Sequence, residues 1–255
     1  MNLGLAGKTA LVFGASKGIG ASTARILTEE GAQVAITGRT APDVLAAEIS
    51  ALSLAADLTK AGDAERAVEE VMAKFGRLDI VVVSAGAAQG GLYWTLDDNV
   101  WEDAMALKFM GLVRALRAAT PPMRAQKSGR IIAVVGNLGL QPDKRLLPGS
   151  AANAACLALI RGAADELAAD GVQVSAINPG PTRTQRWSTL IDNLAAAQGR
   201  PREEVEAERL AAMSSGRIAE PDEIGRLIAV LASDFAGHVT GGALTVDGGM
   251  TRGIG

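Results

Sequence analysis

Short apolar runs alternate with longer amphipathic stretches along the whole chain. The runs are rich in Val, Ile and Ala and do not alternate with polar residues, which is typical of strands buried on both faces. They predict strands at Thr9–Phe13, Gln33–Thr37, Leu52–Ala56, Ile80–Ser84, Arg130–Val135, Val172–Ile177 and Ala243–Val246. The stretches between them predict helices at Ile19–Glu30, Pro42–Ser50, Ala61–Phe75, Val100–Ala119, Ser150–Ala169 and Pro221–Leu231.

Strand–helix alternation over the full length predicts an α/β fold. The expected architecture is a doubly wound parallel sheet of the Rossmann type, with about seven strands and helices on both faces. Right-handed crossovers place the ligands of such a sheet at the carboxyl ends of its strands. No linker, low-complexity segment or fixed-period repeat interrupts the pattern, so residues 1–255 are expected to form a single dinucleotide-binding domain.

One stretch departs from the alternation. Thr182–Ala219 is polar, charged and prone to form helix, and it follows the sixth predicted strand. Insertions at this place cover the ligand crevice, so a mobile substrate lid is one interpretation. A solvated pair of surface helices is the other.

Composition adds limits on partners and location. Hydrophobic residues make up 48% and charged residues 21% of the chain, which is ordinary for a globular protein. A net charge of -3 gives no reason to expect nucleic acid, and no apolar run approaches the ~18 residues that span a bilayer. The one cysteine, Cys156, excludes an internal disulfide, is expected to be a buried inert thiol and suits a cytoplasmic location. With a single histidine, His238, the chain cannot supply a metal site based on His and Cys.

A glycine-rich loop follows the first predicted strand and opens a helix. From Gly14 to Gly20 it has the spacing G-x-x-x-G-x-G. Glycines allow a tight turn and a close approach to a pyrophosphate, whose charge the helix N-terminus stabilises. The loop therefore predicts a nucleotide site that involves Gly14, Ser16, Lys17, Gly18, Ile19 and Gly20.

The end of the second strand bears on which dinucleotide binds. An NAD site requires a carboxylate there for the ribose 2′-hydroxyl, but the chain has Gly38 followed by Arg39. Arg39 and Lys17 suit a 2′-phosphate, because charge-assisted hydrogen bonds to phosphate are strong. We therefore expect NADP(H) rather than NAD(H), the alternative being that both residues are ordinary surface cations.

Further candidates lie at the ends of other strands. A carboxylate after the third strand can accept from the adenine amino group, and the small residues after the fourth let a nucleoside lie against the backbone. A rigid turn with hydroxyl groups follows the sixth strand. The candidate residues on these segments are Asp57, Leu58, Ala85, Gly86, Pro179, Gly180, Thr182 and Thr184.

Together these segments resemble the short-chain dehydrogenase/reductase family over essentially all 255 residues. The family's T-G-x-x-x-G-I-G loop matches except that Phe13 replaces the threonine, and its N-N-A-G motif is reduced to V-S-A-G at residues 83–86. The N-P-G-x-x-x-T turn matches at 178–184, and the V-T-G-x-x-L-x-V-D-G-G tail at 239–249. The resemblance implies NADP(H) held by the residues above and a small-molecule substrate. It also implies a homotetramer or homodimer that uses the final strand and the long fourth and fifth helices.

The family's catalytic tetrad does not carry over. Its tyrosine and lysine fall on Gly149 and Asn153, its serine on Gly136 and its helix asparagine on Lys108. Tyr93 is the only tyrosine, and no lysine stands four places after it. General acid–base help is typically worth ~10²–10⁴ in rate, so its loss is expected to impair ordinary carbonyl reduction. The two glycines are expected to leave a wider pocket.

The changes at 108 and 153 look like an exchange that keeps one ammonium group near the site. The alternative is that Lys108 points to solvent or pairs with an acid such as Asp103. Asn137 and Ser150 are other polar candidates beside the changed positions. They are explained equally well as a turn residue and a helix N-cap.

Three functions from different classes are compatible with this pattern. The first is an NADP(H)-dependent oxidoreductase that acts on a CH–OH or C=O group with substitute catalytic groups. The second is a catalytically inactive subunit that partners an active relative in a mixed oligomer. The third is a non-redox lyase or isomerase on the same scaffold, because a fold does not fix a function. The preserved cofactor motifs favour the first.

Overall fold

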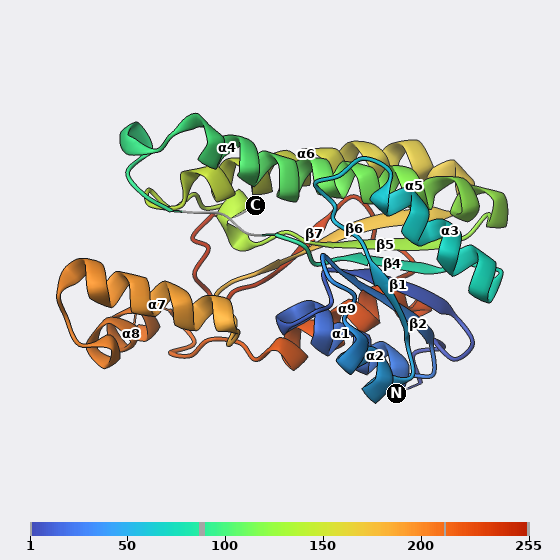
Figure 1. The fold of residues 1–255 in the computed structure, drawn as a ribbon, viewed down its shortest axis with the longest axis horizontal. Coiled ribbons are helices and arrows are strands. Elements are labelled where there is room, and N and C mark those ends of the chain that lie inside the picture. The colour runs from blue at the N-terminus through green and yellow to red at the C-terminus, as the bar shows by residue number, and fades with distance from the viewer. Residues whose placement is uncertain (1, 87–89, 212, 254–255) are drawn as a thin grey trace.

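The computed structural model describes residues 2–86, 90–211 and 213–253. Within them, parallel strands form one seven-stranded sheet in the order β3-β2-β1-β4-β5-β6-β7 (Figure 1). The strands are β1 (Thr9–Phe13), β2 (Gln33–Gly38), β3 (Leu52–Ala55), β4 (Ile80–Val83), β5 (Gly129–Val134), β6 (Val172–Pro179) and β7 (Ala243–Val246). The predicted doubly wound sheet is confirmed, and every predicted strand is present with ends that shift by at most two residues.

Helices cover both faces of this sheet. They are α1 (Gly18–Glu29), α2 (Asp43–Ile49), α3 (Asp63–Phe75), α4 (Asp98–Ala104), α5 (Gly111–Gln126), α6 (Leu147–Leu167), α7 (Gln185–Gln198), α8 (Arg202–Ala211) and α9 (Pro221–Ala232). Helices α3, α5 and α6 pack on one face of the sheet, and α1, α2 and α9 pack on the other (Figure 1).

Two cores, one on each face of the sheet, explain why the strands do not alternate. In β1, Leu11 and Phe13 belong to the core with α3, α5 and α6, whereas Ala10 and Val12 belong to the core with α1 and α9. All four side chains are fully buried. Each large apolar side chain that is removed from water contributes about 1.5–3 kcal/mol, so burial on both faces fixes the central strands in place.

The predicted helix over Val100–Ala119 is wrong as a single regular helix. A π-helical segment, Met105–Met110, separates α4 from α5, and α5 continues to Gln126. A π turn accommodates an extra residue and changes the direction of the side chains that it carries. No residue type marks a π turn, so a continuous helix-forming stretch predicts one regular helix. Lys108 lies inside this π segment.

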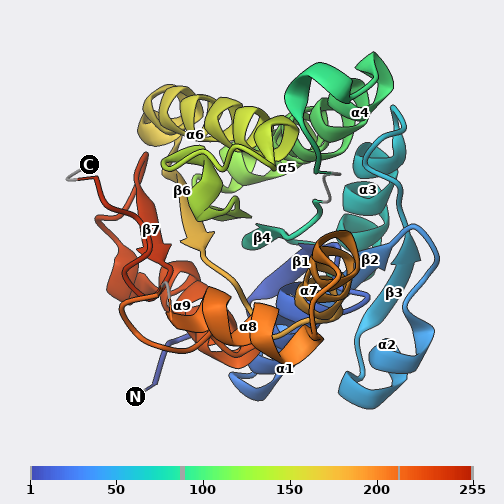
Figure 2. The same cartoon turned by 90° about the vertical axis from the view of Figure 1, so that its left-hand side faces the viewer.

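The segment Thr182–Ala219 forms a helix pair, α7 and α8, beyond the carboxyl end of β6 (Figure 2). Its two ends meet, because Thr182 and Ala219 form an isolated parallel bridge. It has a small core of its own, formed by Trp187, Ile191, Met213 and Ile218. The segment therefore has a small core of its own beside the sheet, and its movement as a lid stays a prediction.

Gly20 tests how tightly α1 packs on the loop after β1. A Cβ at Gly20 would overlap the carbonyl oxygen of Gly14 and lie 3.1 Å from the Cα of Ala15. We expect Gly20→Ala to lower the free energy of unfolding by about 1–3 kcal/mol, the usual cost of overpacking. Gly162→Ala is the matched control, because nothing lies within 4 Å of a Cβ added at this position of α6. Helix propensity predicts a gain of about 0.5–1 kcal/mol there, and urea unfolding that gives both variants equal stability would contradict the contact at Gly20.

Candidate functional site

The loops after β1 and β4 touch at the carboxyl edge of the sheet. Gly14 has a φ of +76° and comes so close that a Cβ on it would lie 2.8 Å from the backbone nitrogen of Ala85. From β1 the chain continues into α1 on one face, and from β4 it continues towards α5 on the other. This is the topological switch point, where open α/β sheets bind their ligands.

The N-terminus of α1 is free to bind an anion. Its first turn has no acidic residue, and no side chain caps its N–H groups. A groove of about 430 Å³ runs beside it and is lined in part by Ser16, Lys17, Gly18 and Thr184. Free N–H groups and the helix dipole attract phosphate to such a place. Four of the predicted cofactor residues therefore meet around one anion-binding helix end.

The two cations predicted for a 2′-phosphate lie on different sides of this loop. The Nζ of Lys17 donates to Oε1 of Gln185, in the first turn of α7, at 2.9 Å. Arg39 lies exposed directly after β2. Its neighbour Gly38 approaches Ser16, because a Cβ at Gly38 would lie 3.4 Å from the Cβ of Ser16. Arg39 is thus the cation next to the glycine loop, and Lys17 links the loop to α7.

Asp57 and Leu58, after β3, have different surroundings. Oδ1 of Asp57 accepts from the hydroxyl of Thr59 at 2.8 Å and from its backbone N–H at 3.0 Å. These bonds, with the charge of Arg39 nearby, hold the pKa of Asp57 below its usual value. Leu58 is buried in the core, and its carbonyl accepts from Arg114 at 2.7 Å. Only Asp57 therefore offers a side-chain acceptor at this strand end.

The turn after β6 is held by its own backbone and by the end of β7. A Cβ on Gly180 would lie 2.8 Å from the Cα of Asp247, so this position has room only for glycine. The Thr182 hydroxyl donates to the Gly180 carbonyl at 3.1 Å and is buried. Thr182 therefore stabilises the turn, whereas Thr184 lines the groove at α1.

Lys108, Gly136 and Asn153 meet at the carboxyl end of β5. The Nζ of Lys108 donates to the carbonyl oxygen of Val134 at 2.7 Å. A Cβ on Gly136 would lie 3.0 Å from Nδ2 of Asn153. Gly149 lies in the first turn of α6, one turn before Asn153. The four positions that the sequence analysis singled out thus sit on elements that converge at one strand end.

The space beside Gly136 is filled. Its φ is +121°, a conformation that residues with a side chain rarely adopt, and the Asn153 amide occupies the position next to it. The expectation of a wider pocket is therefore wrong on this side of the site. A serine at position 136 would require a different backbone conformation, because few residues with a side chain adopt a φ of +121°.

Lys108 points into the protein, so the interpretation that it faces solvent or pairs with Asp103 is wrong. Its ammonium also lies against the loop after β4, since a Cβ on Gly86 would lie 3.0 Å from the Nζ. Burial lowers the pKa of Lys108 to about 8, and the nearby charge of Arg186 acts in the same direction. An ammonium group with a lowered pKa therefore stands at the carboxyl ends of β4 and β5.

Arg186 is a site residue that the sequence analysis does not single out. It lies in the first turn of α7, and its Nη1 donates to the carbonyl oxygen of Gly86 at 3.3 Å. Partial desolvation by neighbouring protein atoms lowers the pKa of Arg186, although the residue is exposed to solvent. Its only signal in the sequence is a cation two places after Thr184. The fold, which brings α7 to the end of β4, makes that signal meaningful.

The other polar candidates, Asn137 and Ser150, serve the structure around the site. Nδ2 of Asn137 donates to Asp247 at 3.4 Å and ties the loop after β5 to the end of β7. Ser150 lies inside α6, so its interpretation as an N-cap is wrong. Its hydroxyl donates to the Leu146 carbonyl at 3.0 Å and accepts from the Asp143 N–H at 3.3 Å, which holds the start of the helix.

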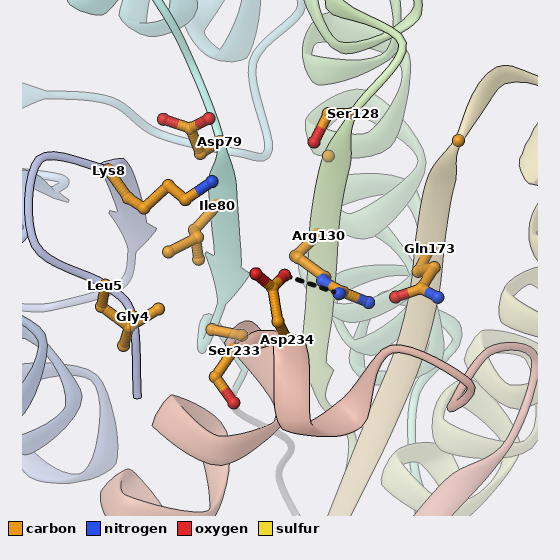
Figure 3. A pocket seen from close by; sticks show the side chains of 13 residues that line it. Gly4, Leu5, Lys8, Asp79, Ile80, Ser128, Arg130, Gln173, Ser233 and Asp234 are labelled. Atoms are coloured by element: carbon orange, nitrogen blue, oxygen red, sulfur yellow. Dashed lines mark hydrogen bonds and ion pairs between the residues drawn. The ribbon is translucent and has the colours of Figure 1, made fainter. Parts of the chain in front are cut away.

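A second cavity, of about 110 Å³, lies at the opposite edge of the sheet (Figure 3). Its lining includes Lys8, Asp79, Arg130 and Asp234. Arg130 pairs with Asp234 at 3.3 Å, and the buried Asp79 accepts from the backbone N–H of Thr9 at 2.8 Å. Arg130, Asp234 and Asp79 therefore have partners within the protein, and the cavity lies at the amino ends of the strands, where doubly wound sheets do not bind their ligands.

Among the described residues, no group of three or more His, Cys, Asp or Glu side chains is placed to hold a metal ion. None of the helices in this part of the chain combines the length and hydrophobicity of a membrane span. Cys156 is buried, as predicted, and burial raises the pKa of its thiol.

The sheet order, the switch point and the free end of α1 define a doubly wound α/β protein of the Rossmann type. A family model described as Enoyl-(Acyl carrier protein) reductase matches residues 14–251. The chain belongs to the short-chain dehydrogenase/reductase family.

Relatives match over nearly their whole length. The 3-oxoacyl-(acyl-carrier-protein) reductase FabG of Staphylococcus aureus is 31% identical over 254 residues, covering 95% of this chain and 98% of that protein. The cis-4-hydroxycyclohexanecarboxylate dehydrogenase of Sinomonas cyclohexanicum is 35% identical over 258 residues, with 98% and 99% covered. A crystal structure of a variant actinorhodin polyketide ketoreductase with NADPH has a TM-score of 0.93 at 27% identity and covers 96% of this chain and 98% of its own.

Lys108→Met tests what the buried ammonium costs the fold. A pKa lowered from 10.5 to about 8 means that the charged form destabilises the folded state at neutral pH. The full shift corresponds to about 3 kcal/mol, and the loss of the bond to Val134 offsets part of any gain. We therefore expect the unfolding free energy at pH 7 to rise by about 1–2 kcal/mol.

The pH dependence supplies the check. The gain should shrink as pH rises from about 8 to 10.5. In this range Lys108 of the folded wild-type protein loses its proton while the unfolded chain keeps it, so the wild-type protein becomes more stable and the variant does not. Urea unfolding near pH 7 and near pH 10 measures it, with Lys74→Met on the exposed side of α3 as the control. A gain that stays constant or grows with pH would contradict the burial of a charged Lys108.

Proposed function

We propose that this protein is an NADP(H)-dependent oxidoreductase that interconverts an alcohol and a carbonyl group, with Lys108 as its acid–base residue. The observation that carries the proposal is the Lys108 ammonium, which donates to the Val134 carbonyl at 2.7 Å on the same sheet edge as the glycine loop. A charge that is buried without a carboxylate destabilises a fold. A subunit that only binds nucleotide has no use for such a charge at this place.

The choice of NADP(H) is supported by the residues at the strand ends and by a relative. β2 ends without a carboxylate and is followed by the exposed Arg39. Gly14 and Gly20 leave no space for a Cβ, and α1 is uncapped, so the loop fits the phosphates of a dinucleotide. The actinorhodin ketoreductase, which has the same fold, is in complex with NADPH. When bound, this cofactor supplies the hydride for carbonyl reduction.

Lys108 would supply the proton that the carbonyl oxygen needs. Gly136 and Gly149 carry no donor, and the amide of Asn153 is not an acid. A pKa of about 8 makes the Lys108 ammonium a stronger acid than an ordinary lysine while it stays largely protonated at neutral pH. An N–H bond of Lys108 breaks as the O–H bond of the alcohol forms, and the neutral amine then regains a proton from water.

The relatives support the reaction type and leave the substrate open. One is named for a 3-oxoacyl group on acyl carrier protein and another for a hydroxycyclohexanecarboxylate. Exchange between a carbonyl and an alcohol is what these two names have in common. It is therefore the part of their activity that we carry over to this chain.

The homotetramer or homodimer stays a prediction. It is supported by β7, which is an edge of the sheet and is mostly exposed. Leu244 in this strand is 41% exposed, and Val239 just before it is 43% exposed. An edge strand with apolar side chains is normally covered by another chain or element.

Arg39→Gln tests the choice of cofactor. If Arg39 binds the 2′-phosphate, the loss of a charged hydrogen bond of about 1.5–3 kcal/mol should weaken NADPH binding roughly 10–100-fold. NADH binding should hardly change, because NADH has a hydroxyl group at this position. Fluorescence titration of both nucleotides measures this, with Lys74→Gln as the control. Equal losses for the two nucleotides would contradict the role of Arg39.

Lys108 variants test the acid–base role. We expect Lys108→Met to lower kcat for carbonyl reduction by ~10²–10⁴ with little change in NADPH affinity. Lys108→Arg keeps the charge but cannot release a proton near neutral pH, so it should be equally slow. The wild-type kcat should fall as pH rises through about 8, where Lys108 loses its proton. A wild-type protein that binds NADPH but oxidises it with no carbonyl compound would point instead to an inactive subunit.

A further inference from the structure

The arginines of the helix pair α7–α8 differ in what they bind. Arg186 has the Gly86 carbonyl as its hydrogen-bond acceptor, and no carboxylate among the described residues forms an ion pair with it. Four other arginines of the segment form ion pairs: Arg183 pairs with Glu220 at 2.7 Å and Arg217 with Glu223 at 2.7 Å. Arg200 and Arg202 pair with acidic residues of the same segment. Arg209 in α8 has no ion pair among the described residues, but only Arg186 reaches the end of β4, where its Nη1 bonds to Gly86.

A second cation stands beside it without a counter-charge. The Lys108 Nζ and the Arg186 Nη1 both approach Gly86, one at 3.0 Å from where its Cβ would be and the other at 3.3 Å from its carbonyl oxygen. Burial and then the charge of Arg186 lower the pKa of Lys108, whereas Arg186 itself is exposed to solvent. An anion bound between the two cations would favour the charged form of both.

We propose that Arg186 binds a carboxylate group of the substrate, so that the enzyme acts on oxo acids and hydroxy acids. The inference rests on the proposed function and adds the substrate class. A guanidinium group presents two parallel N–H donors that match the two oxygens of a carboxylate. Its position next to Lys108 places the bound carboxylate close to the group that handles the proton. Arg186 would therefore orient the substrate, and Lys108 would handle the proton.

The pyrophosphate of the cofactor is the other anion that Arg186 could bind. The place for that group is the uncapped N-terminus of α1, where Gly18 and Thr184 meet. Arg186 instead reaches across to the end of β4, on the side of Lys108. The two anions therefore have separate partners in this structure.

The test uses acids and esters that differ in one charge. Pyruvate, acetoacetate and levulinate place a carboxylate at increasing distances from the ketone, and their methyl esters remove the charge but keep the ketone. With the wild-type protein and NADPH, at least one acid should have a kcat/KM roughly 10–100-fold above that of its ester, the value of a charged hydrogen bond. Arg186→Gln should abolish this preference, so that the acid and its ester have similar kcat/KM values. Arg209→Gln, in α8, is the matched control.

Binding measured without turnover separates this inference from the proposed function. Calorimetric titration of each acid into the protein–cofactor complex should give a Kd that rises roughly tenfold in Arg186→Gln, with the Kd of NADPH unchanged. Acid binding that depends on Arg186 without any oxidation of NADPH would support the inference and remove the proposed function. Ester reduction as fast as acid reduction, or no acid binding, would overturn the inference and leave the function standing. A tenfold weaker NADPH affinity with no acid preference would assign Arg186 to the cofactor pyrophosphate.

Discussion

The site depends on one backbone contact, the approach of Gly14 to Ala85. Parallel strands β1 and β4 are neighbours, so the loops that follow them begin in contact. The two loops then lead to helices on opposite faces of the sheet. A Cβ on Gly14 would force the two loops apart. The groove at α1, the loop after β4 and the ammonium of Lys108 against Gly86 all take their positions from this contact. Glycine at position 14 is therefore a requirement of the whole carboxyl edge.

The sheet and the glycine loop could be predicted from the sequence, because both depend on local residue properties. Strands buried on two faces read as continuous apolar runs, and close backbone approaches require glycine wherever they occur. The direction of Lys108 is not local in this sense. It depends on a π segment, which no residue type marks, and on the Val134 carbonyl 26 residues further along the chain. Arg186 reaches its acceptor 100 residues earlier in the chain, so its role appears only once the chain is folded.

A charge at the Lys108 position is costly in the absence of ligands. Ordinary packing would favour an apolar side chain there, since the pKa of the lysine is lowered mainly by burial. The Val134 carbonyl satisfies one N–H of the ammonium but carries no negative charge. Stability and function therefore oppose each other at this residue. Conflicts of this kind mark functional sites, because a sequence selected for folding alone would remove them.

The residues Lys108, Gly136 and Asn153 fit one another in the structure. The Asn153 amide fills the space beside Gly136, and Gly136 adopts a φ of +121° that a side chain would strain. Lys108 brings back, from another element, the ammonium that Asn153 lacks. A serine at 136 would meet the Asn153 amide in an unfavourable backbone conformation. Each position is therefore adjusted to the others, as expected of a site that has acquired a different set of polar groups and kept its fold.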